Sequence, residues 1–284
     1  MRPSKTEILE RERRWAIPAA VAALAAVGFV LAAVFIATQS VGSTSGDSEL
    51  LRQVDQHRSA QMISSLLQAI GVGLLAAPLF YLFRAAQARS ATMRGQLVGV
   101  VVAAPLFLVI LAILSGVSTL SAATDFVNND VPRLLAHHVA LGSDRANKVA
   151  SDAISGTSLR PLAAGFGLAG QLGFLIGMVY TCLHAMRVGL LSRFWGSLGM
   201  ALGAVSFVFF QFALLWFVYL AVLLIGRIPG GRPPAWAAGE AIPWPTPGEK
   251  AAKALDGGDG GDPPEGDNGT DPEPAERRKR KQRD

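Results

Sequence analysis

The chain has 284 residues, of which 51% are hydrophobic and 17% are charged, and its formal net charge is +5 at pH 7. The charged residues are almost wholly excluded from five long apolar windows, which excludes a large soluble core and indicates a multi-pass membrane protein. A basic chain can also bind nucleic acid, but these basic residues mostly flank the apolar windows or lie in the run 277–283, so no nucleic-acid partner is expected. The single cysteine, Cys182, excludes an intramolecular disulfide and a cysteine-based metal cluster.

The apolar windows predict an all-α, polytopic transmembrane bundle with five spans and a disordered C-terminal tail. Each window reaches the roughly 20 residues that a helix needs to cross about 30 Å of hydrocarbon. The first window follows a short polar N-terminus, residues 1–14, and is too long for the core of a signal peptide, which spans about 7–15 residues. The predicted spans are 15–37, 62–83, 97–120, 162–186 and 198–225.

The segments between the spans carry weaker structural signals. Asp47 or Ser48 is the predicted N-cap of a helix that leads into the second span, where Gly71, Gly73 and Pro78 predict a kink. The third loop, 121–161, is the one sizeable ordered candidate outside the membrane. It contains two helix-like pieces, 129–139 and 143–154; the first has an apolar stripe that fits a helix on the membrane or over the bundle.

The character of the chain changes after the last window. Residues 226–248 are dense in Pro, Gly and Trp, and we expect this strip to lie along the membrane interface or to pack under the bundle. From residue 249 onward, the composition cannot bury enough apolar area to offset the entropy of ordering, so the prediction for 249–284 is a disordered charged tail.

Basic residues predict the orientation in a cell membrane. The N-terminus and the turns 84–96 and 187–197 hold ten Lys and Arg in 38 positions, whereas the loops 38–61 and 121–161 hold six in 65. Because cytoplasmic loops are richer in Lys and Arg, we expect the N-terminus in the cytoplasm. Five spans then put the C-terminus outside, although residues from 226 onward carry ten more basic side chains, so the side of the tail stays open.

Small residues recur at spacings that matter for helix packing. Residues 165–170, GFGLAG, match the dinucleotide motif G-x-G-x-x-G, but no strand precedes them and no acidic residue follows about 20 positions later. Helix packing is therefore favoured over cofactor binding, and no cofactor is expected. Three further G-x-x-x-G steps could let helices approach closely, within the chain or in a homo- or hetero-oligomer. They are Gly95/Gly99, Gly173/Gly177 and Gly199/Gly203.

Polar residues inside the predicted spans are neutral. Gln68, Gln171 and Gln211 are expected to face one another or the bundle interior, since an unpaired amide is costly in hydrocarbon. No ionisable residue lies in the interior of a span to mark a transport path. Adjacent His137 and His138 point about 100° apart on a helix, so a metal site is not expected. Nor does the sequence contain a catalytic set, which argues against an enzyme.

Over residues 160–203 and 226–244 the chain carries a resemblance to known proteins. The residues that show it are AMRVGLLSRFWGSLGMALG, at 185–203, and GRIPGGRPPAWAAGEAIPWP, at 226–245. They resemble an uncharacterised family of small multi-pass membrane proteins from actinobacteria. The resemblance implies a bacterial cell-membrane location, and it brings no activity and no functional residue. The first functional hypothesis is a non-enzymatic structural or interaction protein that uses its tail and third loop as binding surfaces. The alternative is a small transporter or channel subunit in which the three glutamines line a neutral polar path.

Overall fold

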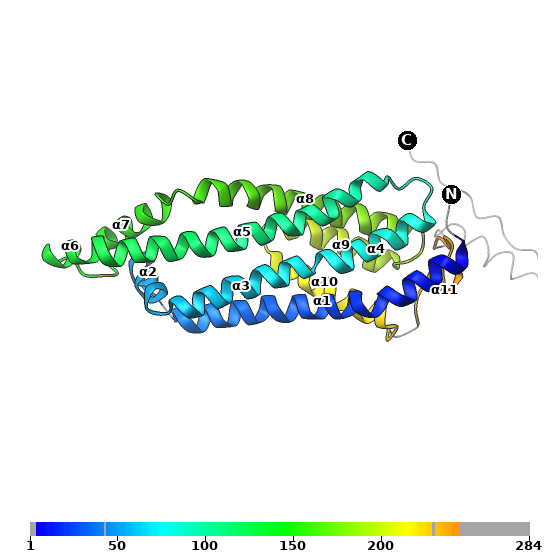
Figure 1. Cartoon of the computed structure of the whole chain (residues 1–284), viewed down its shortest axis with the longest axis horizontal. Coiled ribbons are helices and arrows are strands. Elements are labelled where there is room, and N and C mark those ends of the chain that lie inside the picture. Colours follow the sequence, from blue (N-terminus) through cyan, green and yellow to red (C-terminus); the bar gives the residue numbers. More distant parts are fainter. Residues whose placement is uncertain (1–3, 43, 229–230, 245–284) are drawn as a thin grey trace, which may run out of the picture. The chain divides into compact units, whose positions relative to one another are not determined.

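The computed structural model describes residues 4–42, 44–228 and 231–244. These residues belong to one compact unit that ends at Trp244, and the predicted disorder of 249–284 lies outside the described residues. Within the described part every regular element is helical (Figure 1). The fold class predicted from the sequence, all-α, is confirmed for these residues.

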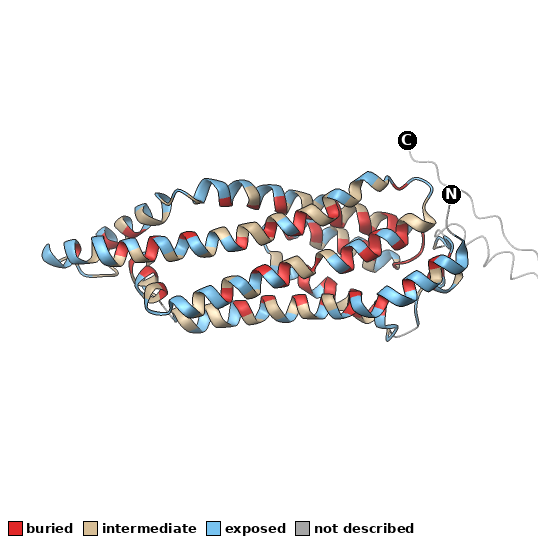
Figure 2. Ribbon diagram, in the orientation of Figure 1, coloured by how far each residue is buried: buried red, intermediate tan, exposed pale blue. Residues whose placement is uncertain are grey.

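Four helical stretches are long and apolar enough to cross a membrane: Lys5–Val41, Arg58–Arg89, Gly95–Ala136 and Arg160–Arg187. Figure 2 shows that much of their surface is exposed, and the exposed side chains include large apolar ones on every stretch. A water-soluble protein rarely leaves so much apolar surface uncovered, so the four helices indicate a membrane protein. Representative exposed residues are Leu31, Phe35, Leu66, Ile113, Leu168 and Ile176.

The first helix, α1 (Lys5–Val41), extends well beyond the predicted span 15–37. Ser4 and Glu7 form a capping box at its start: the Glu7 N–H donates to Ser4 Oγ and the Ser4 N–H donates to the Glu7 carboxylate. With 37 residues, α1 is about 56 Å long, which exceeds the hydrocarbon thickness of about 30 Å. Residues 5–14, assigned from the sequence to a polar N-terminus, are therefore the first turns of this helix.

The second spanning stretch is interrupted in the region where a kink was predicted. After the short helix α2 (Asp47–Gln56), whose N-cap is Gly46 and not Asp47 or Ser48, α3 (Arg58–Leu74) and α4 (Ala76–Arg89) meet at Leu75. Pro78 has no N–H to donate to the carbonyl of Leu74, four residues earlier, so the regular helical bonding lapses there. The interruption at Leu75 lies between Gly73 and Pro78, two of the residues from which the kink was predicted.

Helix α5 (Val98–Asp125) follows the 3-10 turn η1 (Gly95–Leu97) and outlasts the predicted span 97–120. It continues through the π-helical η2 (Phe126–Asp130) into α6 (Val131–Ala136), and α7 (Asp144–Ser155) then folds back. Ser143 is the N-cap of α7, and its Oγ accepts the N–H of Ala146. Elements α2, η2, α6 and α7 bury a small core of their own, which we call the cap; its members include Leu51, Val54, Phe126, Leu134, Ala146 and Ala150.

The last apolar window departs most from expectation. After α8 (Arg160–Arg187), the structure has two short helices, α9 (Arg193–Val205) and α10 (Phe210–Ile225), so the prediction of one helix over 198–225 is wrong. Their 13 and 16 residues correspond to about 20 and 24 Å, and neither reaches the roughly 20 residues of a full crossing. In the break between them, Phe207, Val208 and Phe209 still donate their N–H groups to carbonyls of the last turn of α9.

Contacts between α9 and α10 show that the second helix runs back along the first. The Trp216 Nε1–H donates to the carbonyl of Trp195 at 3.1 Å, and the rings of Trp195 and Tyr219 stack with centroids 3.5 Å apart. A residue near the start of α9 thus contacts the second half of α10. We call this pair the re-entrant hairpin, because α10 ends at the end of the bundle from which α9 began.

The helices form a ring only in the half of the bundle that the hairpin occupies. Neighbouring elements pack in the order α1, α3 and α4, α5, α8, α9, α10 and again α1. Large, fully buried side chains gather in this half, among them Phe83, Phe174, Trp216 and Phe217. The hairpin tip, with Val208 71% exposed and Phe209 55% exposed, stops short of the cap.

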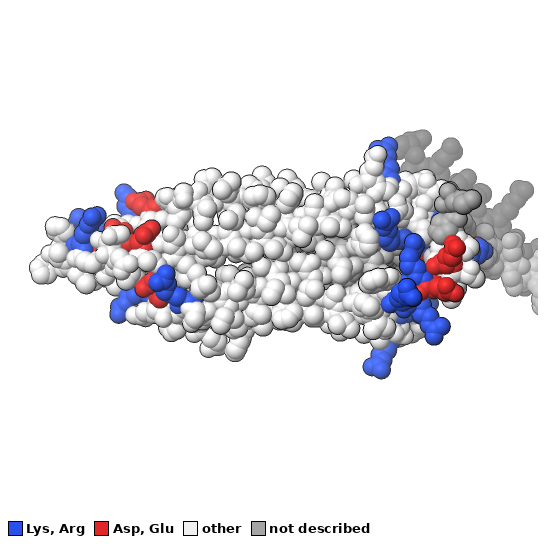
Figure 3. Space-filling model, in the orientation of Figure 1, with Lys and Arg blue, Asp and Glu red and all other residues white. Residues whose placement is uncertain are grey.

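Charged side chains gather at the two ends of the bundle and leave the middle free of charge on the face seen in Figure 3. We call the end where α1 begins the basic end. Its described Lys and Arg are Lys5, Arg11, Arg13, Arg14, Arg84, Arg89, Arg94, Arg187, Arg193, Arg227 and Arg232, against the acids Glu7, Glu10, Glu12 and Glu240. At the cap end, the described Lys and Arg are Arg52, Arg58, Arg133, Arg145, Lys148 and Arg160. The described acidic residues there are Asp47, Glu49, Asp55, Asp125, Asp130, Asp144 and Asp152.

Candidate functional site

A buried ion pair lies at the basic end. Glu12 of α1 and Arg89 of α4 face each other with side chains only 8% and 0% exposed. Arg89 Nη2 donates to Glu12 Oε2 at 2.9 Å and Nη1 donates to Glu12 Oε1, so the contact is bidentate. A buried charge is tolerated only when it is paired and hydrogen-bonded, so this pair fixes how α1 and α4 meet.

Arg89 uses all five of its N–H donors. Besides Glu12, it donates from Nη1 to the carbonyl of Ala85 at 3.0 Å, and from Nε and Nη2 to the carbonyl of Ala235 at 3.2 and 3.0 Å. Ala235 opens the short helix α11 (Ala235–Ala238), which follows the hairpin. One guanidinium therefore joins the start of α1, the end of α4 and the segment after α10.

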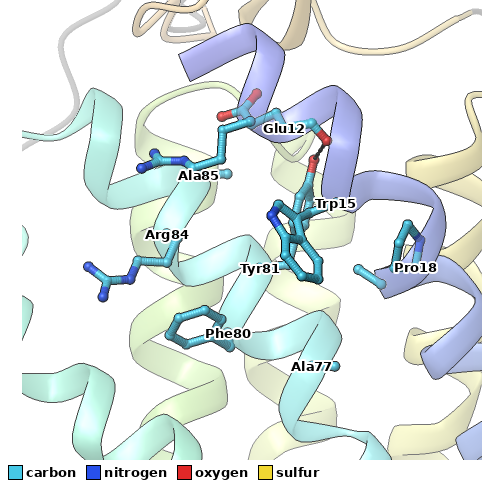
Figure 4. Close-up of a pocket in the computed structure, with 10 residues that line it drawn as sticks. Glu12, Trp15, Pro18, Ala77, Phe80, Tyr81, Arg84 and Ala85 are labelled. Atoms are coloured by element: carbon cyan, nitrogen blue, oxygen red, sulfur yellow. Dashed lines mark hydrogen bonds between the residues drawn. The ribbon is translucent and has the colours of Figure 1, made fainter. Parts of the chain in front are cut away.

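Aromatic rings surround the pair. Trp236 stacks on Tyr81 with centroids 6.1 Å apart, and the Arg89 guanidinium lies 5.8 Å from the centroid of Trp236. The Tyr81 hydroxyl donates to the carbonyl of Glu12 at 3.1 Å (Figure 4), and the Trp236 Nε1–H donates to the carbonyl of Leu190 at 2.9 Å. We call Glu12, Tyr81, Arg89 and Trp236 the lock, because they join three separate stretches of chain, α1, α4 and the segment after α10.

The described residues 231–244, which we call the C-terminal strip, are fastened to the basic end at further points. Arg232 Nε donates to the carbonyl of Leu223 at 3.0 Å, and Trp244 Nε1–H donates to the carbonyl of Leu191 at 2.8 Å. Backbone pairing of Ile242 with Val188 adds a 3.1 Å bond, and Lys5 forms an ion pair with Glu240. The described strip packs under the bundle, one of the two arrangements expected for 226–248; residues 229–230 and 245–248 of that range lie outside the described residues.

Chemically, the lock is a fastening. The Glu12 carboxylate forms a bidentate pair with Arg89, and each N–H of the Arg89 guanidinium has an acceptor. Among the described residues, no group of three or more His, Cys, Asp or Glu side chains lies close enough together to hold a metal ion. What the site does is hold the C-terminal strip in place.

The three predicted glutamines do not come together. Gln68 on α3 and Gln211 at the start of α10 are exposed, and Gln171 on α8 is half-buried. Gln68 lines a notch of about 230 Å³ between α3 and α5, together with Gln61, Ser64, Ser65, Ser115 and Thr119. Gln171 and Gln211 are not among the residues that line this notch, so the three amides do not mark one path.

Two of the three glycine pairs lie where helices approach closely. A Cβ on Gly173 would come within 2.9 Å of Ala104 of α5, and one on Gly177 within 3.4 Å of Val101. Gly199 and Gly203 of α9 face Cys182 and Met178 of α8 in the same way. By contrast, Gly95 lies in the η1 turn and Gly99 has open space around it. The GFGLAG stretch is part of α8, where Gly167 and Gly170 face Leu111 and Leu108 of α5.

Gly199→Ala should loosen the hairpin. Its new Cβ would lie 2.6 Å from both Cys182 Sγ and Trp216 Nε1, and neither the thiol nor the rigid indole can move aside freely. Overpacking of this kind typically costs about 1–3 kcal/mol. We expect a lower free energy of unfolding in detergent. The matched control is Gly99→Ala, where no atom lies within 4 Å of the new Cβ; equal losses in the two variants would contradict close packing at Gly199.

Sequence reasoning missed the lock because it placed Glu12 and Arg89 in polar segments outside the spans. A usable signal was present. Glu12 falls on the same helical face as Ala16, Ala19, Ala23 and Ala26, all of which are buried. Extending that face beyond the apolar window would have predicted that Glu12 packs against a neighbour and needs a cation.

Comparison with known proteins finds no family model, no curated protein and no solved structure that matches the chain. The lock and its surroundings are therefore described from their own geometry.

Proposed function

We propose that the chain crosses a cell membrane four times, with the re-entrant hairpin entering and leaving at the basic end. The basic end has eleven described Lys and Arg against six at the cap end, which supports a cytoplasmic basic end. The N-terminus and the C-terminal strip then lie on the same, cytoplasmic side. An even number of crossings also removes the conflict between five spans and the ten basic residues that follow position 225.

We infer further that the protein is a non-enzymatic membrane protein that works through interactions. The observation that carries this proposal is the fastening of the C-terminal strip by Arg89, Trp236 and Trp244. Trp244, the last described residue, is therefore held beside Leu191 and Arg193, where the turn after α8 leads into α9, which suits a role in presenting the residues that follow it to a partner. The cap offers a second surface on the opposite side of the membrane, and the open space around Gly99 leaves room for a homo- or hetero-oligomer.

Cross-linking in native membranes followed by affinity capture tests this function. The full chain should recover a partner protein in near-stoichiometric amount. A chain ending at Trp244 should fold equally well and lose a partner that binds the following residues, while keeping one that binds the cap. Recovery of no enriched protein by either form would contradict an interaction role.

The alternative, a small transporter or channel subunit, has one observation in its favour. The polar notch that contains Gln68 lies between two spanning helices, and it could admit a small neutral solute. Its volume of about 230 Å³ falls below the roughly 300–1,000 Å³ of ordinary ligand pockets. Solute flux into vesicles holding the purified chain, lost in Gln68→Leu and kept in Gln211→Leu, would favour transport over the interaction role.

Membership of the actinobacterial family remains a proposal, based on the segments 185–203 and 226–245. In the structure, most of these residues belong to α9, the turn before it and the C-terminal strip. These are the parts that meet at the lock, so the resemblance and the proposed interaction role concern the same end of the molecule.

A further inference from the structure

A groove separates α1 from α4 at the basic end, on the outside of the bundle beside the lock. Its volume is about 510 Å³, which is in the range of small-molecule sites. Figure 4 shows Phe80 and Arg84 on one wall and Trp15 and Pro18 on the other. Two lock residues, Glu12 and Tyr81, also line the groove, whose other walls take no part in fastening the C-terminal strip.

The lining changes from charged to apolar along the membrane normal. α1 enters the bundle from the basic end, so Arg11 lies about 10 Å nearer that end than Pro18, seven residues later. α4 runs in the opposite direction, and Arg84 is likewise seven residues nearer the basic end than Ala77. Both walls thus place a guanidinium at the mouth and small apolar groups deeper down. This order matches a membrane lipid in its leaflet, whose charged head group lies at the surface and whose acyl chains lie below it.

The mouth of the groove is positively charged. Among the described residues, neither Arg11 nor Arg84 is paired with a carboxylate, and the nearby Glu12 is already bound to Arg89. Arg84 lies 5.3 Å from the centroid of the Phe80 ring and donates to Gln87 Oε1 at 3.1 Å, so its head group is held beside the opening. Guanidinium groups bind phosphate oxygens with well-matched geometry.

Trp15 places this mouth at the membrane surface. Its side chain is 57% exposed at the boundary between the charged basic end and the apolar belt, where tryptophans of membrane proteins gather. We propose that the groove binds an anionic phospholipid of the leaflet at the basic end, with the phosphate between Arg11 and Arg84 and an acyl chain along Pro18, Ala77 and Phe80. A zwitterionic lipid brings a cation to the same mouth and is bound less well.

Native mass spectrometry of the purified full chain in a mixture of phosphatidylglycerol and phosphatidylcholine tests the charge requirement. The wild-type chain should retain phosphatidylglycerol preferentially. At about 1 kcal/mol for each basic residue near a lipid surface, Arg11→Gln with Arg84→Gln should lower that preference about 25-fold. The control is Arg94→Gln with Arg187→Gln, which removes two exposed arginines from the same end but outside the groove.

A second variant tests the location without changing charge. Ala77 is exposed on the groove wall, so Ala77→Phe fills the apolar part while leaving the core and both arginines in place. Retention of phosphatidylglycerol should fall severalfold, and inorganic phosphate at millimolar concentration should not displace the lipid. The proposal is overturned if the groove pair and the control pair lose the same preference, if Ala77→Phe changes nothing, or if free phosphate displaces the lipid.

Discussion

Arg89→Ala should lower the free energy of unfolding by about 3–5 kcal/mol, because it leaves a buried carboxylate without its counter-ion. Glu12 is 8% exposed and its charge is balanced by Arg89. The substitution also strips the carbonyls of Ala85 and Ala235 of their donor. Equilibrium unfolding of the purified protein in mixed detergent measures the loss.

Two comparisons separate the ion pair from a general effect of lost charge. Arg94→Ala removes an exposed arginine at the same end and should change stability by no more than about 0.5 kcal/mol. Combining Glu12→Leu with Arg89→Met removes both charges and should cost clearly less than the sum of the single changes, since no buried charge is left unpaired. If Arg89→Ala were as harmless as Arg94→Ala, the lock would not hold the basic end together.

Much of the helical architecture was predictable because apolar length is a direct consequence of bilayer thickness. The first four windows each lie within a stretch long enough to cross a membrane. The interruption of the helix near Pro78 followed from local chemistry, which the sequence carries explicitly. Helix ends were less predictable: α1 and α5 continue beyond their windows because tertiary partners cover polar residues such as Glu12 that composition alone assigns to water.

The re-entrant hairpin could not be recognised from composition. A window of apolar residues has the same hydropathy whether it crosses the bilayer once or turns back halfway, and no Gly or Pro lies between Gly203 and Gly226 to mark the turn. The reversal instead depends on distant contacts. Trp216 bonds to Trp195, and Arg232 bonds to the last turn of α10.

The helical face of Glu12 predicts that it needs a cation, but the identity of its partners could not be predicted, for a related reason. The lock joins Glu12, Tyr81, Arg89 and Trp236, which are up to 224 positions apart in the sequence and share no spacing motif. Three glutamines were predicted to face inward because an unpaired polar group is costly in hydrocarbon: Gln68, Gln171 and Gln211. Two of them, Gln68 and Gln211, are exposed on the outside of their helices. The position of a residue along an apolar window does not show which face of the helix its side chain occupies.

The second prediction with a large expected effect is the side of the membrane on which the chain emerges after α10. Four crossings and a hairpin put residues 231–244 on the same side as the 84–96 turn, whereas five crossings put them on the opposite side. The difference is all-or-none. The chain suits a cysteine test because Cys182 is its only cysteine and is fully buried.

Labelling of single cysteines in intact cells by a membrane-impermeant maleimide is the most direct test of this topology. The sites are Ala91→Cys, Ala140→Cys and Ala241→Cys, all exposed, in a Cys182→Ala background. We predict that Ala140→Cys is labelled in intact cells and that Ala91→Cys and Ala241→Cys are labelled only after permeabilisation. Labelling of Ala91→Cys and Ala241→Cys alone would reverse the orientation but keep the hairpin. Labelling of Ala241→Cys together with Ala140→Cys, with Ala91→Cys protected, would show a fifth crossing and contradict the re-entrant hairpin.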